Sequence, residues 1–294
     1  MPLVIGTRGS ALALVQADRA CALLREAGIG TEKTIITTEG DTITNFPLHE
    51  IGGQGIFVRA LDDAILSGKI DAAVHSMKDI PAARPAGVVT AAVLPRDSPA
   101  DFLAHLVPEG DIRVIGTSST RRKAQLLRHF PGLTVKNLRG NVDTRLRKLS
   151  EGRYDAIVLA EAGIGRLSLD VPGRRLPPET FVPAPNQGII AVVCRDDPDI
   201  RAAVARLDDP ETRVDAAIER AVMEELGGGC YTPIGIYSVG GHLTAEVLSL
   251  DGKRQVRHEE GIRDPDSARS AGRRLRAEAG ELIREAWERL GVKG

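Results

Sequence analysis

The sequence is poor in aromatic residues and in cysteine, and it lacks the short motifs of nucleotide-binding enzymes. Aromatic residues make up 3% of the 294 residues, so a nucleic-acid surface built on base stacking is poorly supported. Cys21, Cys194 and Cys230 are odd in number and far apart, which excludes a disulfide framework and gives no zinc-ligand spacing. The chain contains no P-loop and no GxGxxG motif, so nucleotide chemistry has no anchor.

Long apolar runs and a leader-like N-terminus are also missing. No run approaches the ~18 apolar residues of a membrane-spanning helix. The start, Met1-Pro2-Leu3-Val4, lacks the basic and apolar regions of a signal peptide. The net charge is -1, with 39 Lys and Arg against 40 Asp and Glu, which excludes a uniformly basic coat protein. With 42% hydrophobic residues, we expect a cytoplasmic globular protein of two or three domains without a membrane partner.

Strand and helix patterns alternate over the first two thirds of the chain and then start again. Val4-Ile5-Gly6-Thr7 returns 110 positions later as Val114-Ile115-Gly116-Thr117, each time before a hydroxyl-rich turn and a helical pattern. A second echo pairs residues 69–74 with 153–158, in the same order. Chance recurrence of apolar strand sequences is the alternative. Strand–turn–helix units predict doubly wound α/β sheets, whose ligands bind beyond the carboxyl ends of the strands.

Two Pro-containing breaks, at 94–99 and 181–188, divide the chain. We expect three domains: α/β domain 1 at 1–95 plus 189–207, α/β domain 2 at 100–186, and a small α+β domain 3 at 210–294. The strand pattern that follows the second break returns to domain 1 in this scheme. Within domain 1, residues 34–38 are expected to form a strand.

Positive charge is concentrated in one segment of the chain. Only 8 of the 39 cationic residues are Lys, so 31 are Arg, which suits two-pronged recognition of carboxylate or phosphate. Genome composition is the alternative explanation of this excess. Between residues 121 and 148 the chain has nine cations and one acid, Asp143, so this segment carries +8 and the remainder -9.

Several of these cations lie at predicted strand-to-helix turns, where free backbone N–H groups and the helix dipole favour an anion. Arg121 and Arg122 follow a hydroxyl-rich turn, and Arg8 lies in the matching turn of the first domain. Arg139 and Arg145 follow the next predicted strand, so we expect this set to bind anions. A solvated basic face is the alternative, and it is the interpretation for three residues on helix surfaces: Lys123, Arg128 and Arg147.

Two further clusters follow predicted structural elements. His75-Ser76-Met77-Lys78-Asp79 comes directly after a buried strand, where catalytic residues tend to lie. Asp79 could stabilise a developing cation or exchange a proton, and Lys78 could bind a carboxylate, although a local surface ion pair explains both equally well. His75 is expected to be a structural hydrogen-bonding partner.

Cys230 follows three consecutive glycines, which let the backbone approach another group closely. We therefore expect a reactive or covalently modified thiol at Cys230. Cys21 and Cys194 fall within apolar patterns and are expected to be inert core residues.

Taken together, the motifs resemble the hydroxymethylbilane synthase family, also called porphobilinogen deaminases. The resemblance runs in order from residue 3 to about 240. The motifs that carry it are Ile5-Gly6-Thr7-Arg8-Gly9-Ser10, His75-Ser76-Met77-Lys78-Asp79, Gly116-Thr117-Ser118-Ser119-Thr120-Arg121-Arg122, Leu138-Arg139-Gly140-Asn141-Val142, Pro183-Ala184-Pro185 and Gly228-Gly229-Cys230.

The resemblance implies a transferase that condenses four porphobilinogen molecules head to tail, releasing ammonia and then the linear tetrapyrrole hydroxymethylbilane. It implies a dipyrromethane cofactor held through a thioether to Cys230. The implied fold has three domains, the first two similar to periplasmic binding proteins, with the cofactor in the cleft between them. We expect a monomer that uses no metal and binds no nucleic acid.

The resemblance also implies roles for individual residues. Asp79 matches the catalytic carboxylate that contacts pyrrole N–H groups. The residues that match cofactor contacts are Lys78, Ser76, Thr117, Ser119, Arg121 and Arg122. The residues that match binders of substrate carboxylates are Arg8, Arg139, Arg145 and Arg166.

The chemistry of the substrate agrees with these residue types. Each porphobilinogen carries acetate and propionate groups, so a growing chain accumulates carboxylates that suit many Arg residues. Loss of ammonia leaves a cationic pyrrole species, which one nearby carboxylate stabilises. A primer tethered to Cys230 makes each condensation effectively intramolecular.

This sequence departs from the family pattern at two positions. Gln54 stands where the family usually has Lys, which leaves the role of the 43–55 loop open. Asn186 stands where Gly is common.

Two other function classes remain as alternatives. A two-lobed anion-binding protein without activity would account for the echoes and the Arg residues, but not for Cys230 and Asp79. A nucleic-acid binder using the 121–148 segment conflicts with the low aromatic content and the acidic remainder.

Overall fold

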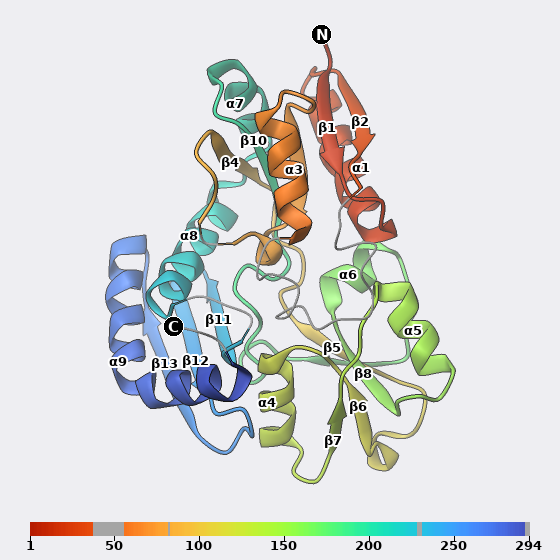
Figure 1. The fold of residues 1–294 in the computed structure, drawn as a ribbon, viewed down its shortest axis with the longest axis vertical. Coiled ribbons are helices and arrows are strands. Elements are labelled where there is room, and N and C mark those ends of the chain that lie inside the picture. The colour runs from red at the N-terminus through yellow and green to blue at the C-terminus, as the bar shows by residue number, and fades with distance from the viewer. Residues whose placement is uncertain (38–55, 82, 228–230, 292–294) are drawn as a thin grey trace. The chain divides into compact units, whose positions relative to one another are not determined.

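The structure is a computed structural model that describes residues 1–37, 56–81, 83–227 and 231–291 (Figure 1). The chain forms two compact units, each made of two stretches of sequence. Met1–Asp97 and Gly188–Arg213 form the first unit, and Ser98–Gln187 and Val214–Gly294 form the second. The expected second and third domains therefore lie in one unit, while the exact domain boundaries stay a prediction.

The first unit is built on a five-stranded sheet with the order β2-β1-β3-β10-β4. Its strands are β1 (Leu3–Thr7), β2 (Thr31–Ile35), β3 (Ala72–Ser76), β4 (Val88–Val93) and β10 (Ile190–Arg195). β1 is parallel to β2 and β3, whereas β10 is antiparallel to both of its neighbours, so the sheet is mixed. The strand after the second break thus returns to this sheet, as the sequence predicts.

One strand boundary differs from the sequence prediction. β2 occupies residues 31–35 rather than 34–38, because its parallel pairing with β1 runs from Leu3 opposite Thr31 to Thr7 opposite Ile35. The strand Thr-Glu-Lys-Thr-Ile lies at the sheet edge and is half exposed or exposed, so it has no apolar run to mark it.

Helices of the first unit pack on this sheet. They are α1 (Ala11–Glu26), α3 (Ile56–Leu66) and α7 (Pro198–Val204), with 3-10 turns η1 (Met77–Asp79) and η3 (Ala205–Leu207). Ser10 caps α1 by accepting a hydrogen bond from the Ala13 N–H at 3.3 Å, as its position predicts. Between α1 and the strands, fully buried Ile5, Leu24 and Val192 belong to the core.

The second unit contains a sheet of the same design, with the order β7-β6-β8-β5-β9. Its strands are β5 (Asp101–His105), β6 (Val114–Gly116), β7 (Thr134–Lys136), β8 (Ala156–Ala160) and β9 (Gly173–Leu176). Its helices are α4 (Thr120–His129), α5 (Val142–Ser150), α6 (Glu161–Arg166) and the 3-10 turn η2 (Glu109–Asp111). β6 is parallel to β7 and β8, and β5 is antiparallel to β8 and β9.

The two sequence echoes correspond to the same pair of strands in each sheet. Gly6 of β1 pairs with Ala73 of β3, and Gly116 of β6 pairs with Ile157 of β8, so both echoes share one register. A Cβ on Gly6 would collide with the Ile70 side chain, and one on Gly116 would lie 2.8 Å from Cδ1 of Tyr154. Ile70 and Tyr154 hold matching positions in the second echo. The sequence repeat is therefore also a structural repeat. In each sheet the glycine leaves room for the side chain at the matching position of the second echo, Ile70 or Tyr154.

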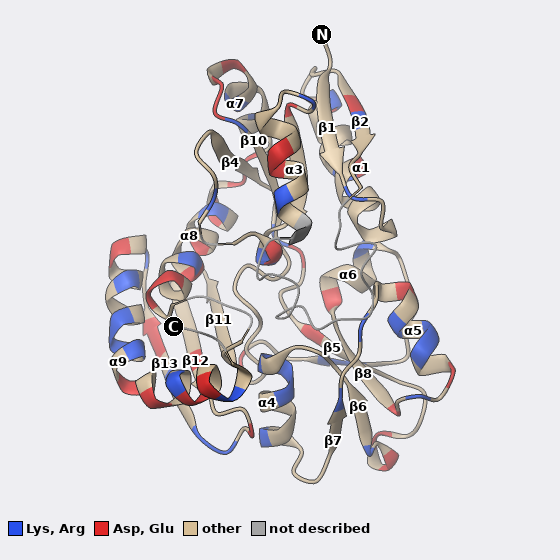
Figure 2. Cartoon of the chain, in the orientation of Figure 1, with Lys and Arg blue, Asp and Glu red and all other residues tan. Residues whose placement is uncertain are grey.

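The second unit also contains a small antiparallel sheet, β11-β12-β13. Its elements are β11 (Ile234–Val239), β12 (His242–Leu248), β13 (Gln255–Gly261), α8 (Pro210–Glu225, which starts in the first unit) and α9 (Pro265–Leu290). β13 has no sequence signal, because Gln-Val-Arg-His-Glu-Glu-Gly is mostly polar, and none of its residues is buried in the structure. Basic and acidic residues both occur along α9 (Figure 2).

Several contacts join this small sheet to the α/β part of the second unit, among them two at β11. The Ile236 N–H donates to the Pro183 carbonyl at 3.0 Å, so this segment lies against the edge strand β11. A Cβ on Gly235 would lie 2.8 Å from Cβ of Val182, so the approach requires glycine. Among the residues that the structure describes, none of the helices is both long and apolar enough to span a membrane.

Candidate functional site

Lys78 and Asp79 lie in η1, at the carboxyl end of the buried strand β3. Both side chains are exposed, while the flanking Met77 and Ile80 are buried. The Met77 N–H donates to the Ile189 carbonyl at 2.9 Å, which continues the pairing of β3 with β10. The turn thus presents a cation and a carboxylate to solvent from a buried strand end.

His75 and Ser76 occupy the last two positions of β3. Nε2 of Gln16 donates to Oγ of Ser76 at 2.8 Å. Nε2 of His75 is buried and has no hydrogen-bond partner among the described residues. Burial, together with the positive charges of Arg84 and Arg8, lowers the pKa of His75 to about 3, so its imidazole is neutral. Arg8 follows β1 directly, and β1 pairs in parallel with β3. The positive charge of Arg8 therefore acts on His75 at the end of β3.

The corner between β6 and α4 carries three hydroxyl side chains. Oγ of Ser119 caps α4 by accepting from the Arg122 N–H at 3.3 Å, and Oγ1 of buried Thr117 accepts from the Ser119 N–H at 3.2 Å. Ser118 bonds to the backbone of Leu138, which follows β7. The first turn of α4 contains no acidic residue, so the corner favours an anion.

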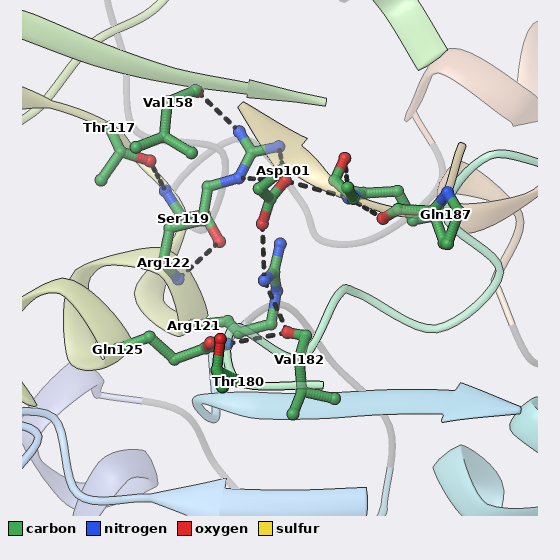
Figure 3. Close-up of polar contacts among 12 residues, drawn as sticks. Asp101, Thr117, Ser119, Arg121, Arg122, Gln125, Val158, Thr180, Val182 and Gln187 are labelled. Carbon is green, nitrogen blue, oxygen red and sulfur yellow. Dashed lines mark hydrogen bonds and ion pairs between the residues drawn. The ribbon is translucent and has the colours of Figure 1, made fainter. Parts of the chain in front are cut away.

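Arg121 and Arg122 are buried, and both pair with Asp101 at the start of β5 (Figure 3). Nη1 of Arg121 lies 2.8 Å from Oδ2 of Asp101, and Nη2 of Arg122 lies 2.7 Å from Oδ1. Burial alone would raise the pKa of Asp101, but the two guanidinium groups hold it well below its usual range.

Backbone carbonyl groups and Gln187 complete this cluster. Nη1 of Arg121 donates to the Val182 carbonyl at 2.8 Å, and Nη1 of Arg122 donates to the Val158 carbonyl at 2.9 Å. Nε2 of Gln187 donates to Oδ1 of Asp101 at 2.9 Å. Sequence reasoning missed Asp101, whose only signal is an acid at the start of an apolar strand. The structure describes the contacts of Arg121 and Arg122 with the protein itself. Their expected role in binding the cofactor stays a prediction.

The other expected carboxylate binders of the second unit follow its parallel strands. Arg139 lies between β7 and α5, Arg145 lies within α5, and Arg166 ends α6, which follows β8. All three side chains are half buried. Nε of Arg145 donates to the Gly140 carbonyl at 2.7 Å, and Gly140 has φ of 114°, which favours glycine. The adjacent strands β7, β6 and β8 therefore bring this set and the Thr117–Ser119 corner to one edge of the sheet.

Several residues behave as the sequence predicts for residues outside the site. Lys123, Arg128 and Arg147 are exposed, and Arg147 pairs with Glu151 at 3.1 Å. Cys21 and Cys194 are buried, and burial raises the pKa of both thiols, that of Cys194 to about 11. Neither thiol is therefore a nucleophile at neutral pH.

Two of the expected positions lie outside the described residues: Cys230, and Gln54 with its 43–55 loop. Asn186 is described, and its φ of 62° explains why Gly or Asn suits this position. The Asn186 N–H donates to Oε2 of Glu219 at 2.5 Å. Fully buried Glu219 also accepts from the Ser238 N–H at 2.8 Å, and it is a second buried acid that sequence reasoning missed.

The donor set of the second unit suits a polycarboxylate. It combines hydroxyl groups, half-buried guanidinium groups and a helix N-terminus without acids. Among the described residues, no group of three or more His, Cys, Asp or Glu side chains could hold a metal ion. These groups therefore fit a ligand with carboxylate side chains, such as a dipyrromethane.

Comparison with known proteins assigns the family. Residues 3–202 match the family model described as "Porphobilinogen deaminase, dipyromethane cofactor binding domain", and residues 214–281 match "Porphobilinogen deaminase, C-terminal domain". The chain belongs to the porphobilinogen deaminase family. The resemblance stated from the sequence motifs is thereby confirmed, and the first family domain includes Asp79 and every expected Arg residue.

Relatives in this family match over nearly their full length. A probable porphobilinogen deaminase of Methanosarcina acetivorans is 50% identical, covering 96% of this chain and 94% of the relative. A porphobilinogen deaminase of Rubrobacter xylanophilus is 44% identical, covering 94% and 92%. Among solved structures, a periplasmic substrate-binding protein from Coxiella burnetii has a TM-score of 0.43 at 15% identity, covering 74% of this chain and 96% of that one.

Proposed function

We propose that this chain catalyses the stepwise head-to-tail condensation of four porphobilinogen molecules, with release of ammonia and then of hydroxymethylbilane. This is the porphobilinogen deaminase (hydroxymethylbilane synthase) reaction of tetrapyrrole biosynthesis. The observation that carries the proposal is the exposed carboxylate of Asp79 at the end of a buried strand, in a chain whose family is porphobilinogen deaminase. We further propose that the protein acts as a cytoplasmic monomer, without metal or nucleic acid.

The cations are proposed to bind the acetate and propionate groups of porphobilinogen and of the growing chain. Arg139, Arg145 and Arg166 serve this role in the second unit, and Arg8 serves it in the first. A guanidinium group can hold a carboxylate through two parallel hydrogen bonds, which fixes orientation as well as charge.

Asp79 is proposed to act on the reacting substrate. When the aminomethyl C–N bond breaks, its electron pair leaves with the nitrogen, which departs as ammonia after accepting a proton. Positive charge then remains on the substrate pyrrole. The Asp79 carboxylate stabilises this charge through the pyrrole N–H and can take up the proton released when the next carbon–carbon bond forms.

In this proposal the dipyrromethane is attached through Cys230. Its other contacts are with Lys78, Ser76, Thr117, Ser119, Arg121 and Arg122. When bound through Cys230, it supplies a covalent primer with a nucleophilic pyrrole carbon. The protein's part is to bind and orient the carboxylates and to stabilise the charge at the reacting pyrrole.

The first test is the intact mass of the purified protein. We expect a mass above that of the polypeptide by one two-pyrrole unit, and Cys230→Ser should lack this unit. Cys194→Ala is the matched control, because Cys194 is buried and should leave the adduct in place. A wild-type mass equal to the polypeptide alone would contradict the covalent cofactor.

The second test is Asp79→Asn. We expect kcat for porphobilinogen consumption to fall about 10²–10³-fold, the usual effect of removing one electrostatic stabiliser of a transition state. Folding should be unaffected, because the side chain is exposed. Asp18→Asn, which changes another exposed acid of the same unit, is the control. Wild-type kcat in Asp79→Asn would contradict the assigned role.

A further inference from the structure

The η1 turn that carries Lys78 and Asp79 is too short to hold itself in place. One backbone hydrogen bond, from the Ile80 N–H to the Met77 carbonyl at 3.1 Å, closes it. A single 3-10 turn has poorer hydrogen-bond geometry than an α-helix and occurs as a connector. The position of Asp79 therefore depends on how the segments before and after η1 are held.

The segment before η1 is held by the sheet and by α1. Ser76 pairs with Ile190 in the antiparallel ladder of β3 and β10, and the Met77 N–H extends this pairing to the Ile189 carbonyl. Gln16 is itself buried and donates to Oγ of Ser76.

Beyond η1, Arg84 is tied to α3 by a buried ion pair. Nη2 of Arg84 lies 2.5 Å from Oδ1 of Asp62, and the side chains are only 11% and 6% exposed. Asp62 lies in the middle of α3, which packs against β3. The pair thus links the chain five residues beyond Asp79 to the helix that covers the strand before it.

Net stability is a poor explanation for this ion pair. Taking both charges out of water costs about as much as their attraction returns, and apolar pairs of similar size are often equally stable. Burial raises the pKa of Asp62 to about 6, opposed by Arg84, so the carboxylate is charged and the ion pair forms at neutral pH. Its particular contribution is geometric, because a guanidinium–carboxylate contact fixes distance and direction.

We propose that the Asp62–Arg84 ion pair positions the η1 turn for catalysis, holding Asp79 where the substrate loses ammonia. Asp62 and Arg84 are positioning residues, since they act through Asp79 rather than on the substrate. This inference rests on the proposed function. It predicts that loss of the pair lowers turnover while substrate binding and cofactor attachment are kept.

The test compares Asp62→Asn, Asp62→Glu and the apolar double variant Asp62→Leu/Arg84→Met with wild type. Readouts are kcat and KM for porphobilinogen, the intact mass as a measure of attached cofactor, and the urea midpoint. We expect Asp62→Asn to lower kcat about 10- to 100-fold, the usual cost of a small misplacement, with KM and adduct mass unchanged. Asp62→Glu should recover part of kcat. The double variant should have a urea midpoint close to that of wild type, but its kcat should stay low.

Arg195→Met is the matched control. Arg195 pairs with Asp71 at 3.3 Å, at the opposite end of β3 from Asp79, so its loss removes an ion pair of the same sheet without touching η1. Its kcat should equal that of wild type.

Two results would overturn the inference while leaving the proposed function in place. If kcat follows the urea midpoint across all variants, including recovery in the double variant, the pair is structural only. The pair is also structural only if Asp62→Asn keeps the kcat of an active wild-type enzyme. A wild-type protein that does not consume porphobilinogen would overturn the proposed function itself, and the inference with it.

Discussion

The two strand–turn–helix corners that begin the repeated sheets differ in where they place positive charge. Aligned on their caps, Ser10 and Ser119, the first helical turns put Leu12 and Ala13 of α1 at the positions of Arg121 and Arg122 of α4. The first corner instead carries its cation, Arg8, in the turn before the helix. One topology therefore supports an apolar helix start in one unit and a buried cationic start in the other.

The same difference continues on the neighbouring strand. Ile190 of β10 pairs with Ser76, and Asp101 of β5 pairs with Ala160, at matching positions of the two sheets. The first unit thus has a fully buried isoleucine where the second has the carboxylate that neutralises both guanidinium groups. The same sheet design therefore forms in the first unit without the ion triad of Asp101, Arg121 and Arg122, so we expect apolar side chains at these positions to be tolerated in the second unit as well.

The largest expected effect comes from breaking the triad. Asp101→Asn should lower the free energy of unfolding by about 3–5 kcal/mol, because it leaves two buried guanidinium groups without their counter-charge. Replacing the three residues by their counterparts, as Asp101→Ile/Arg121→Leu/Arg122→Ala, should be much less destabilising. Urea unfolding of both variants checks this.

The triple variant also separates structure from function. If Arg121 and Arg122 bind cofactor carboxylates as proposed, the triple variant should fold but lack the two-pyrrole adduct in its intact mass. A triple variant less stable than Asp101→Asn would show that the two corners are not interchangeable. A fully loaded triple variant would remove both arginines from the proposed cofactor site.

A smaller effect is expected at the paired glycines. Gly6→Ala and Gly116→Ala should each cost about 1–3 kcal/mol of unfolding free energy, the usual effect of overpacking a core. Ile70→Val should rescue Gly6→Ala, because it removes the methyl group that the new Cβ would meet. It should not rescue Gly116→Ala, whose obstacle is the Tyr154 ring. Rescue of both, measured by thermal unfolding, would contradict the packing argument.

The smallest effect at neutral pH is expected at His75, whose counterpart in the second sheet is Leu159. Because burial lowers the pKa of His75 to about 3, its stabilising contribution is complete above pH 6.5, its unfolded value, and is lost as the pH falls toward 3. His75→Leu should therefore flatten the acid dependence of the unfolding free energy over this range. An unchanged slope between pH 6.5 and 4, measured by urea unfolding, would count against the buried neutral imidazole.

Much of the fold could be predicted from local patterns. The echoes, the returning strand at 189–194 and the cap at Ser10 follow from apolar periodicity and hydroxyl placement, and all three are confirmed. The exposed Lys123 and Arg147 and the buried Cys21 also behave as predicted. Polar edge strands escaped prediction, since β2 and β13 gain their regularity from a neighbour rather than from their own side chains.

Some residues of the candidate site could likewise be predicted from the sequence, and others could not. The motifs around Asp79, Arg139 and Arg145 follow predicted strands and could be named from the sequence. Asp101 and Glu219 could not, because a single acid in an apolar segment does not reveal which distant group it binds. Glu219 joins Asn186 and Ser238, which are 33 and 19 positions away.

The sequence by itself determined the repeated α/β design, the concentration of arginine in one segment and the family. Those properties follow from periodicity, composition and the order of motifs, none of which requires knowing which distant residues are in contact. Only the tertiary structure decided which charged residues have a partner of opposite charge inside the protein. Arg121 and Arg122 look like their exposed neighbours in the sequence, but Asp101 meets them across the sheet, because a buried guanidinium group must find its partner wherever the fold brings one.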